Sequence, residues 1–239
     1  MKKLFLQFFN YLKSPRKHNS KAYTHYLKKR NVTIGDGTYF FDPTHTFIDT
    51  NNGMYIKIGE FCKITSGVHI LAHDYSYSVL RRVYHEIPKK AGMTIIGDNV
   101  FIGLNSIILS GSKIGSNVII GAGSVVSGVI PDNEVWAGNP AKFICTLEDY
   151  YKKCSNSFEK SAIMTIKRYN ELYRRNPTIQ ELQYFSLLFL NNDNQYDSDK
   201  EIKEMSFNGD NKEEVEKDCL KYKSKYNSYK DLLEKINKQ

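Results

Sequence analysis

The sequence predicts a mainly β protein, a parallel β-helix with helical segments at both ends. Between residues 96 and 130 one aliphatic residue recurs at every sixth position, a period that no helix has. Four residues after each aliphatic stands a small or β-branched residue, and the residue directly after it is small, with Leu109 as the exception. A hexapeptide period is typical of a parallel β-helix, in which short strands stack coil on coil around one apolar core. The recurring residues are Ile96, Ile102, Ile108, Ile114, Ile120 and Val126.

The β-helix is predicted to span residues 31–145, and one long segment interrupts it. The six-residue rhythm begins at Val32 and is irregular through the early coil. Residues 75–93 keep no period, whereas the rhythm returns at Ile96. A loop of this length within so regular a scaffold favours a functional role, so we expect an extruded active-site loop here.

An N-terminal helical segment is predicted over residues 1–30. Residues 3–13 carry apolar side chains at helical spacing, which predicts an amphipathic helix. Such a helix packs on the β-helix or on a neighbouring subunit, or it attaches peripherally to a membrane. Gln7 and Asn10 interrupt the apolar stretch and no cleavage site follows, so a signal peptide is not expected.

Residues 146–239 are predicted to form a helical C-terminal extension. One helix is expected over residues 157–174, and Thr178 with Glu181 forms a capping box for a second helix that ends near Leu190. Apolar and tyrosine side chains over residues 215–236 follow a four-three spacing, which predicts a third, coiled-coil-like helix.

The composition is that of a globular protein with a basic surface. Hydrophobic residues make up 41% of the 239 residues, enough for a substantial core, and the formal net charge is +8. That charge suits an anionic partner such as nucleic acid, a membrane surface or a nucleotide-bearing cofactor. The excess is mostly Lys and scattered, which favours a solvated surface, and no nucleic-acid module is present. The four cysteines fall in no paired spacing, which indicates reduced thiols and a cytoplasmic protein, with the inner face of the membrane as an alternative location.

The repeat, the histidine-bearing loop and the ending AGNPAK together resemble one known family. The segment over residues 96–126 followed by IPDNEVWAGNPAKFI is similar to the hexapeptide-repeat acyltransferases, within them to galactoside and maltose, xenobiotic and polysaccharide O-acetyltransferases. The similarity covers residues 30–145. It implies a left-handed parallel β-helix, a homotrimer, and transfer of an acetyl group from acetyl-CoA to a hydroxyl group.

His73 is the candidate catalytic residue. Acyl transfer to an alcohol needs a base that removes the hydroxyl proton during attack, and an imidazole has a pKa suited to this near neutrality. His73 stands where the repeat gives way to the loop and resembles the loop histidine of the family, which implies direct attack on the thioester. Asp74 either orients an imidazole, serves the acceptor, or satisfies turn backbone.

Other polar residues are candidates for binding or orienting the acceptor. His85, inside the loop, either lines the acceptor site or is solvated. His45, Asp49 and Asn52 lie in the irregular early coil, where the sugar acetyltransferases place residues that orient the acceptor, although an irregular coil needs polar turn residues in any case. His69, His73 and His85 do not match the positions used by zinc-dependent hexapeptide proteins, so no metal is expected.

The resemblance also implies a groove for the pantetheine arm of acetyl-CoA, formed between neighbouring coils of two subunits. Small residues let a ligand lie flat against stacked backbone, and Lys142 is the candidate for a phosphate of the cofactor. Many relatives carry Thr-Lys where this chain has Ser127 and Gly128. The cofactor-binding candidates are Gly103, Leu104, Gly121, Ala122, Ser127 and Lys142. Leu104 also departs from the family, because sugar acetyltransferases have Ser there.

The predicted acceptor is a saccharide hydroxyl, on a capsular polysaccharide, lipopolysaccharide or exopolysaccharide or on a lipid-linked precursor. An antibiotic alcohol is the alternative acceptor. A β-helix that lost its activity and serves as a binding scaffold is the alternative of another class, supported by the missing lysine and opposed by the intact His73.

Overall fold

The computed structural model describes residues 14–189 and 198–237, which form two compact units. One unit is Met1–Glu148 and the other is Asp149–Gln239. The amphipathic helix predicted over residues 3–13 lies outside the described residues. Among the described helices, each is too short or too polar to cross a bilayer.

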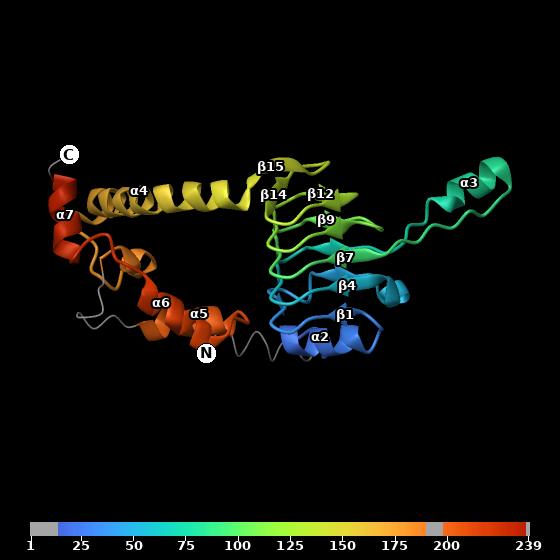
Figure 1. The fold of residues 1–239 in the computed structure, drawn as a ribbon, viewed down its shortest axis with the longest axis horizontal. Coiled ribbons are helices and arrows are strands. Elements are labelled where there is room, and N and C mark those ends of the chain that lie inside the picture. Colours follow the sequence, from blue (N-terminus) through green and yellow to red (C-terminus); the bar gives the residue numbers. More distant parts are fainter. Residues whose placement is uncertain (1–13, 190–197, 238–239) are drawn as a thin grey trace. The chain divides into compact units, whose positions relative to one another are not determined.

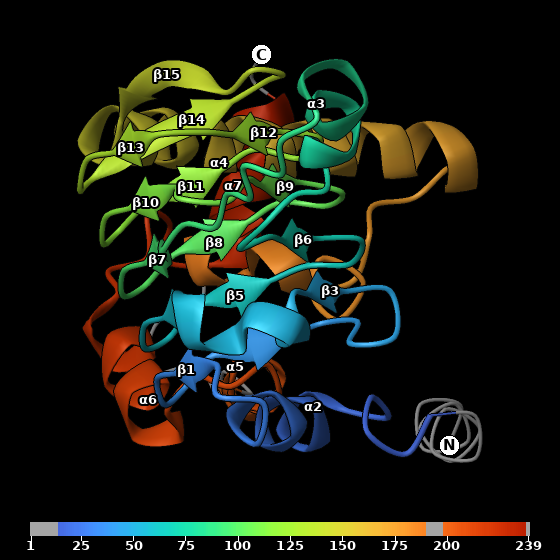
Figure 2. The ribbon, with the colours of Figure 1, turned by 90° about the vertical axis from the view of Figure 1, so that its right-hand side faces the viewer.

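The first unit is a parallel β-helix, as the six-residue period predicts, and it is left-handed, as the family resemblance implies. Three sheets form its sides, and each short strand pairs in parallel with the equivalent strand of the next coil. Figures 1 and 2 show the coils stacked one on another. Sheet A consists of β1 (Thr33–Ile34), β4 (Ile56–Ile58), β7 (Thr94–Ile96), β10 (Lys113–Ile114) and β13 (Val129–Ile130). Sheet B consists of β2 (Tyr39–Phe40), β5 (Lys63–Ile64), β8 (Phe101–Ile102), β11 (Ile119–Ile120), β14 (Glu134–Ala137) and the antiparallel β15 (Lys142–Thr146). Sheet C consists of β3 (Phe47–Ile48), β6 (His69–Ile70), β9 (Ile107–Ile108) and β12 (Val125–Val126).

The core of the β-helix is built from one inward side chain per strand. Successive side chains of a strand point to opposite faces, so a two-residue strand places one residue inside and one outside. Ile102, Ile108 and Ile120 are fully buried, while Phe101 in the same strand as Ile102 is 41% exposed. The small residue four positions after each aliphatic is also buried, as at Ser124, whose hydroxyl donates to a backbone carbonyl. The buried hydroxyls are thereby satisfied without breaking the apolar column.

Helix α2 (Ser20–Lys28) closes the first coil. Its N-cap is Asn19, whose side chain accepts a hydrogen bond from the Ala22 amide at 2.9 Å. Tyr23 and Leu27 are buried against the coil, and the Tyr23 hydroxyl donates to the carbonyl of Thr46 at 3.1 Å. A terminal cap of this kind covers the apolar end that stacking alone would leave open.

An arm leaves the stack between β6 and β7, as predicted, but it contains a helix that the sequence did not indicate. Figure 1 shows this arm projecting from the β-helix with α3 (Tyr77–Tyr84) in it. His73 and Ala91 form an antiparallel bridge, and the Gly92 amide donates to the carbonyl of Ala72 at 3.0 Å. The two ends of the arm are therefore tied together where they join the coil.

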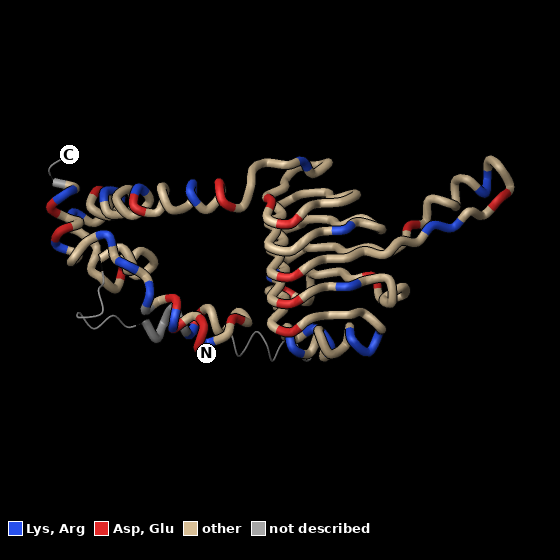
Figure 3. The backbone as a smooth tube through the Cα atoms, viewed as in Figure 1, with Lys and Arg blue, Asp and Glu red and all other residues tan. Residues whose placement is uncertain are grey.

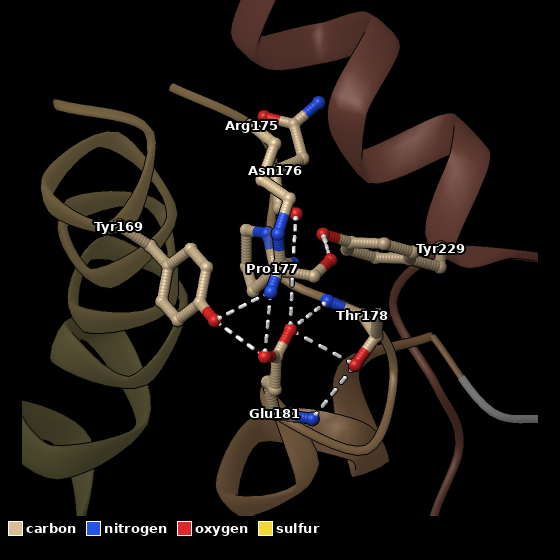
Figure 4. A network of polar contacts seen from close by, with 7 residues as sticks. All are labelled: Tyr169, Arg175, Asn176, Pro177, Thr178, Glu181 and Tyr229. Atoms are coloured by element: carbon tan, nitrogen blue, oxygen red, sulfur yellow. Dashed lines mark hydrogen bonds and ion pairs between the residues drawn. The ribbon is translucent and has the colours of Figure 1, made fainter. Parts of the chain in front are cut away.

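The second unit is helical, but two of its elements differ from the prediction. Helix α4 (Leu147–Tyr173) begins before the expected residue 157. The predicted capping box forms, since the Glu181 amide donates to Thr178 Oγ1 at 3.3 Å and the Thr178 amide donates to Glu181 Oε2 at 2.8 Å. Arg175 and Tyr169 also contact Glu181 (Figure 4). The element that follows is a 3₁₀ helix, η2 (Gln183–Leu188), rather than an α-helix to Leu190.

The single helix predicted over residues 215–236 is wrong. Two helices occupy this part of the chain, α6 (Lys212–Lys221) and α7 (Tyr229–Asn237), and α5 (Ser198–Phe207) precedes them. Between α6 and α7 the Tyr226 amide donates to the carbonyl of Leu188, and at the start of α7 the Tyr229 hydroxyl donates to the carbonyl of Pro177 (Figure 4). With these tertiary hydrogen bonds the chain turns between α6 and α7 and does not continue as one helix. The resulting core contains Ala162, Ile166, Leu182, Leu188, Phe189 and Leu232.

An ion cluster around the half-buried Glu159 joins α4 to α7. Glu159 accepts a hydrogen bond from Lys235 Nζ at 2.6 Å and contacts Lys225 Nζ and the Tyr226 hydroxyl. Burial works to raise the pKa of the Glu159 carboxyl, but the hydrogen bonds from Lys225, Lys235 and Tyr226 prevail and lower it to about 2. The cluster is therefore held in its charged form down to low pH.

We expect Glu159→Gln to destabilise the C-terminal unit in a pH-dependent way. The pKa falls from an ordinary 4.5 to about 2 on folding, so the carboxylate stabilises fully above the unfolded pKa and loses this effect as pH falls towards 2. Thermal unfolding should show a lower Tm for the variant at pH 7 and a smaller difference at pH 2. Glu216→Gln, at an exposed position of α6, is the matched control. An equal loss at both pH values would contradict the assignment.

Candidate active site

His73 and Asp49 meet at one corner of the β-helix. We call this the His73 corner: it comprises the residues that follow the sheet C strands, namely Asp49 after β3, residues 71–73 after β6 and Ser127 after β12. Asp49 Oδ2 contacts His73 Nδ1 from the preceding coil. The Asp49 side chain is 2% exposed and that of His73 is 40% exposed. A buried carboxylate therefore holds an imidazole that solvent and ligands can reach.

The Asp49 carboxylate is held in place by backbone. Its Oδ1 accepts from the Asn51 amide at 3.2 Å at the start of η1 (Thr50–Tyr55), and its Oδ2 accepts from the Ala72 amide at 3.3 Å. Because a buried carboxylate is costly unless its oxygens are satisfied, these contacts and the imidazole explain how Asp49 is accommodated.

The contact with Asp49 decides which ring nitrogen of His73 is basic. A carboxylate only accepts hydrogen bonds, so Nδ1 carries the proton and donates it to Asp49. The lone pair of the neutral ring is then on Nε2. Asn52 Nδ2 lies 3.0 Å from His73 Nδ1 and borders the ring on the same side. His73 thus presents Nε2 as the ring nitrogen that can accept a proton.

Asp74 does not contact the imidazole of His73, although orienting an imidazole was one of the three roles considered for it. Its carboxylate accepts hydrogen bonds from the Ser76 amide at 2.9 Å and from the Ser76 hydroxyl at 2.5 Å. These bonds hold the pKa of Asp74 below its ordinary value. The contact is with turn backbone and a turn hydroxyl, so Asp49 rather than Asp74 lies against His73.

The other predicted acceptor residues lie elsewhere. His45 is in the turn before β3, where its Nδ1 is 2.7 Å from Asp42 Oδ2 and its side chain is 74% exposed. Burial works against ionisation of Asp42, but hydrogen bonds from Thr44, Ser66 and His45 lower its pKa to about 2. His85 is an exposed residue at the end of α3 on the arm. Of the predicted acceptor set, the structure brings Asp49 and Asn52 to His73.

Most of the predicted cofactor residues gather at a second corner. We call this the Gly103 corner: it comprises the residues that follow the sheet B strands, among them residues 103–104 after β8 and 121–122 after β11. The Gly103 amide donates to the carbonyl of Ile120, so the two pairs lie on successive coils. Lys142 pairs in register with Ala137, on the coil above Gly121, and is exposed. Ser127 differs, because it lies at the His73 corner.

Coil stacking explains the glycines at the Gly103 corner. A Cβ on Gly103 would lie 2.5 Å from the Ala122 amide nitrogen, and one on Gly121 would lie 2.7 Å from Ala137 Cβ. Neither position has room for a larger residue, whatever binds outside. The outward surface of this corner is Ala122, Gly123 and the 52% exposed Leu104, beside the exposed Lys142. Small side chains next to a free cation fit a thin pantetheine arm and a phosphate.

His69, the third histidine considered above as a zinc ligand, lies on the face of a sheet. The His69 ring packs edge-on against Phe47, with 5.8 Å between centroids, while His73 lies beyond the corner. Within residues 14–189 and 198–237 no three His, Cys, Asp or Glu side chains come together as metal ligands.

Comparison with known proteins agrees with the geometry. The family described as bacterial transferase hexapeptide (six repeats) matches residues 93–128. Protein CapG of Staphylococcus aureus is 40% identical over 153 residues, which cover 64% of this chain and 83% of that protein. Galactoside O-acetyltransferase of Escherichia coli strain K12 is 32% identical, covering 53% of this chain and 71% of that protein. Chloramphenicol acetyltransferase of Klebsiella aerogenes is 29% identical, covering 56% and 76% respectively.

The fold is that of a protein built from hexapeptide repeats, and a histidine lies at the base of the arm that leaves it. With the identities above, the chain belongs to the hexapeptide-repeat acetyltransferase family. It is an acetyltransferase, and acetyl-CoA is the donor that the family uses. The resemblance noted in the sequence is confirmed at this level.

We expect Asp49→Asn to impair acetyl transfer and Asp74→Asn to leave it nearly unchanged. An amide at position 49 can donate to Nδ1, which would move the ring proton to Nε2 and remove the base. The kcat should fall by about 100-fold or more with a smaller change in KM. Steady-state kinetics would measure both, and a thermal melt would check that Asp49→Asn folds. Equal effects of the two substitutions would contradict the assignment of Asp49 as the positioning residue.

Proposed function

We propose that this acetyltransferase acetylates a saccharide hydroxyl in cell-surface polysaccharide biosynthesis, with His73 as the general base. The observation that carries the proposal is the pair of buried Asp49 and accessible His73 at the base of the arm. The galactoside O-acetyltransferase relative supports a saccharide acceptor. A cytoplasmic location stays a prediction from the sequence.

The proposed chemistry needs one proton acceptor and one charge partner. His73 Nε2 takes the proton of the acceptor hydroxyl as its oxygen bonds to the thioester carbon. The carbon–sulfur bond breaks, and the imidazolium supplies the proton that the departing thiolate sulfur takes up. Asp49 stabilises the imidazolium and keeps the ring in place, since it is buried beside Nδ1.

A homotrimer is proposed because the candidate base and most of the candidate cofactor residues lie at different corners of one chain. The His73 corner and the Gly103 corner lie at opposite edges of sheet C, whose outer face carries Phe47 and His69. A neighbouring subunit that places its Gly103 corner against this His73 corner would complete the site, and a closed cyclic arrangement repeats the contact in every subunit. Phe47 is 49% exposed, which supports an apolar contact at this face.

We expect His73→Ala to lower acetyl transfer by about two to four orders of magnitude, because the general base is lost. Release of the coenzyme A thiol, with oligosaccharides or galactosides as acceptors, would measure the rate. His25→Ala removes an exposed histidine from α2, outside the residues assigned to the site, and is the matched control. Activity of His73→Ala near that of wild type would contradict the mechanism.

The same assay separates the alternatives. The chloramphenicol acetyltransferase relative supports an antibiotic alcohol as a second candidate acceptor. Turnover of chloramphenicol but of no saccharide would favour it over the proposal. Calorimetry with acetyl-CoA separates the enzyme from the scaffold alternative, because a scaffold without activity need not bind the donor.

We expect Lys142→Gln to raise the KM for acetyl-CoA roughly 2- to 10-fold, as an exposed ion pair with a phosphate would, and to change kcat little. Acetyl-pantetheine lacks the nucleotide phosphates, so variant and wild type should use it equally. Lys113→Gln, on the outer face of sheet A, is the matched control. A raised KM that persists with acetyl-pantetheine would contradict a contact between Lys142 and a phosphate of the cofactor.

A further inference from the structure

Positive charge is concentrated at the start of the chain, contrary to the scattered excess expected from composition. Residues 1–35 contain nine Lys or Arg and no Asp or Glu, and the first acidic residue is Asp36. The other 204 residues contain 25 basic and 26 acidic side chains. The net charge of +8 is therefore a property of the N-terminal segment alone.

The structure gathers the described part of this charge on the outer side of α2. Ser20, Tyr23 and Leu27 face the first coil and are buried, so the opposite side of the helix faces away from the β-helix. Figure 3 shows Lys and Arg at this end of the stack. We call the exposed set the basic cap: Arg16, Lys21, Lys28, Lys29 and Arg30. His25 is also exposed on this side.

Internal contacts use little of the charge of the basic cap. Lys28 pairs with Asp36 at 3.8 Å, with side chains 48% and 95% exposed, which is a weak, solvated ion pair. Lys17 differs from the cap residues, since its Nζ donates to the carbonyl of Thr46 at 2.8 Å and burial lowers its pKa. Lys17 therefore fastens the segment to the coil, and the cap residues face solvent.

We propose that the basic cap docks on a membrane surface rich in anionic lipid headgroups. Clusters of four to eight Lys and Arg on a helix suit such a surface, and each strengthens binding by roughly fivefold. Residues 3–13, directly before the cap, carry apolar side chains at helical spacing, which suits the hydrocarbon that lies beneath lipid phosphates. Charge and apolar side chains are thus adjacent in one segment.

The aromatic rings at the cap do not suit a nucleic-acid partner. Single strands are held by stacking of bases on exposed rings. Tyr23 is 1% exposed, and the guanidinium carbons of Arg16 and Arg30 lie 5.5 and 5.6 Å from the centre of the Tyr26 ring. Tyr23 is thus buried, and Tyr26 already contacts two guanidinium groups of the cap, which favours an electrostatic surface that suits phosphate headgroups.

Vesicle flotation with the full chain tests the proposal. The triple variant Lys21→Gln, Lys28→Gln, Lys29→Gln removes three exposed charges and keeps good helix formers. Lys153→Gln, Lys160→Gln, Lys167→Gln removes three exposed charges from α4 and is the matched control. Wild type should bind vesicles of equal phosphatidylglycerol and phosphatidylcholine, less tightly as salt rises. The α2 variant should bind roughly 100-fold more weakly, and the α4 control nearly as wild type.

Three outcomes would overturn the proposal. These are no binding of wild type to the anionic vesicles, equal binding to pure phosphatidylcholine, and equal binding by the α2 variant and wild type. Tighter binding to an oligonucleotide than to the vesicles, with the same dependence on Lys21, Lys28 and Lys29, would assign the cap to nucleic acid instead. The assay uses no acetyl-CoA, and acetylation of a soluble saccharide by the α2 variant should be unchanged. Failure here and failure of the proposed activity are therefore distinguishable.

Discussion

The stacking of coil on coil is the constraint on which the first unit depends. Each two-residue strand can place one side chain inside, so the core is a column of single aliphatic residues such as Ile102 and Ile120. The coils lie so close that a Cβ on Gly103 would touch the backbone of the next coil. Spacing, core and corner residues are thus set by one repeated contact, and a change at one coil is felt by its neighbours.

The same stacking assembles the candidate site. Asp49 and His73 are 24 residues apart in the chain, yet both follow a sheet C strand, so pairing of β3 with β6 brings them together. The tied base of the arm then fixes the backbone of His73. A carboxylate and an imidazole held by regular backbone are pre-organised, which is what catalysis by a positioned base requires.

The basic cap and the site share the first coil. Helix α2 fastens that coil through the bond from Tyr23 to Thr46, three residues before Asp49. The side of α2 that faces the coil thus supports the position of Asp49, and its opposite side carries the charge. One short helix therefore contributes to the stability of the site and, as proposed, to attachment at a surface. The arm begins only after the second coil, so two coils separate it from this helix along the chain.

By itself, the sequence determined the β-helix, because a six-residue period is local and nearly every coil obeys it. It also singled out His73, at the point where the period breaks. It did not pair His73 with Asp49, because the first coil is irregular and the contact depends on which strands stack. Nor did it foresee the break between α6 and α7, where tertiary hydrogen bonds to Leu188 and Pro177 override a helical pattern. Only the tertiary structure decided these points. Each is a contact between two separate segments, and the local pattern of neither segment indicates which other segment it will contact.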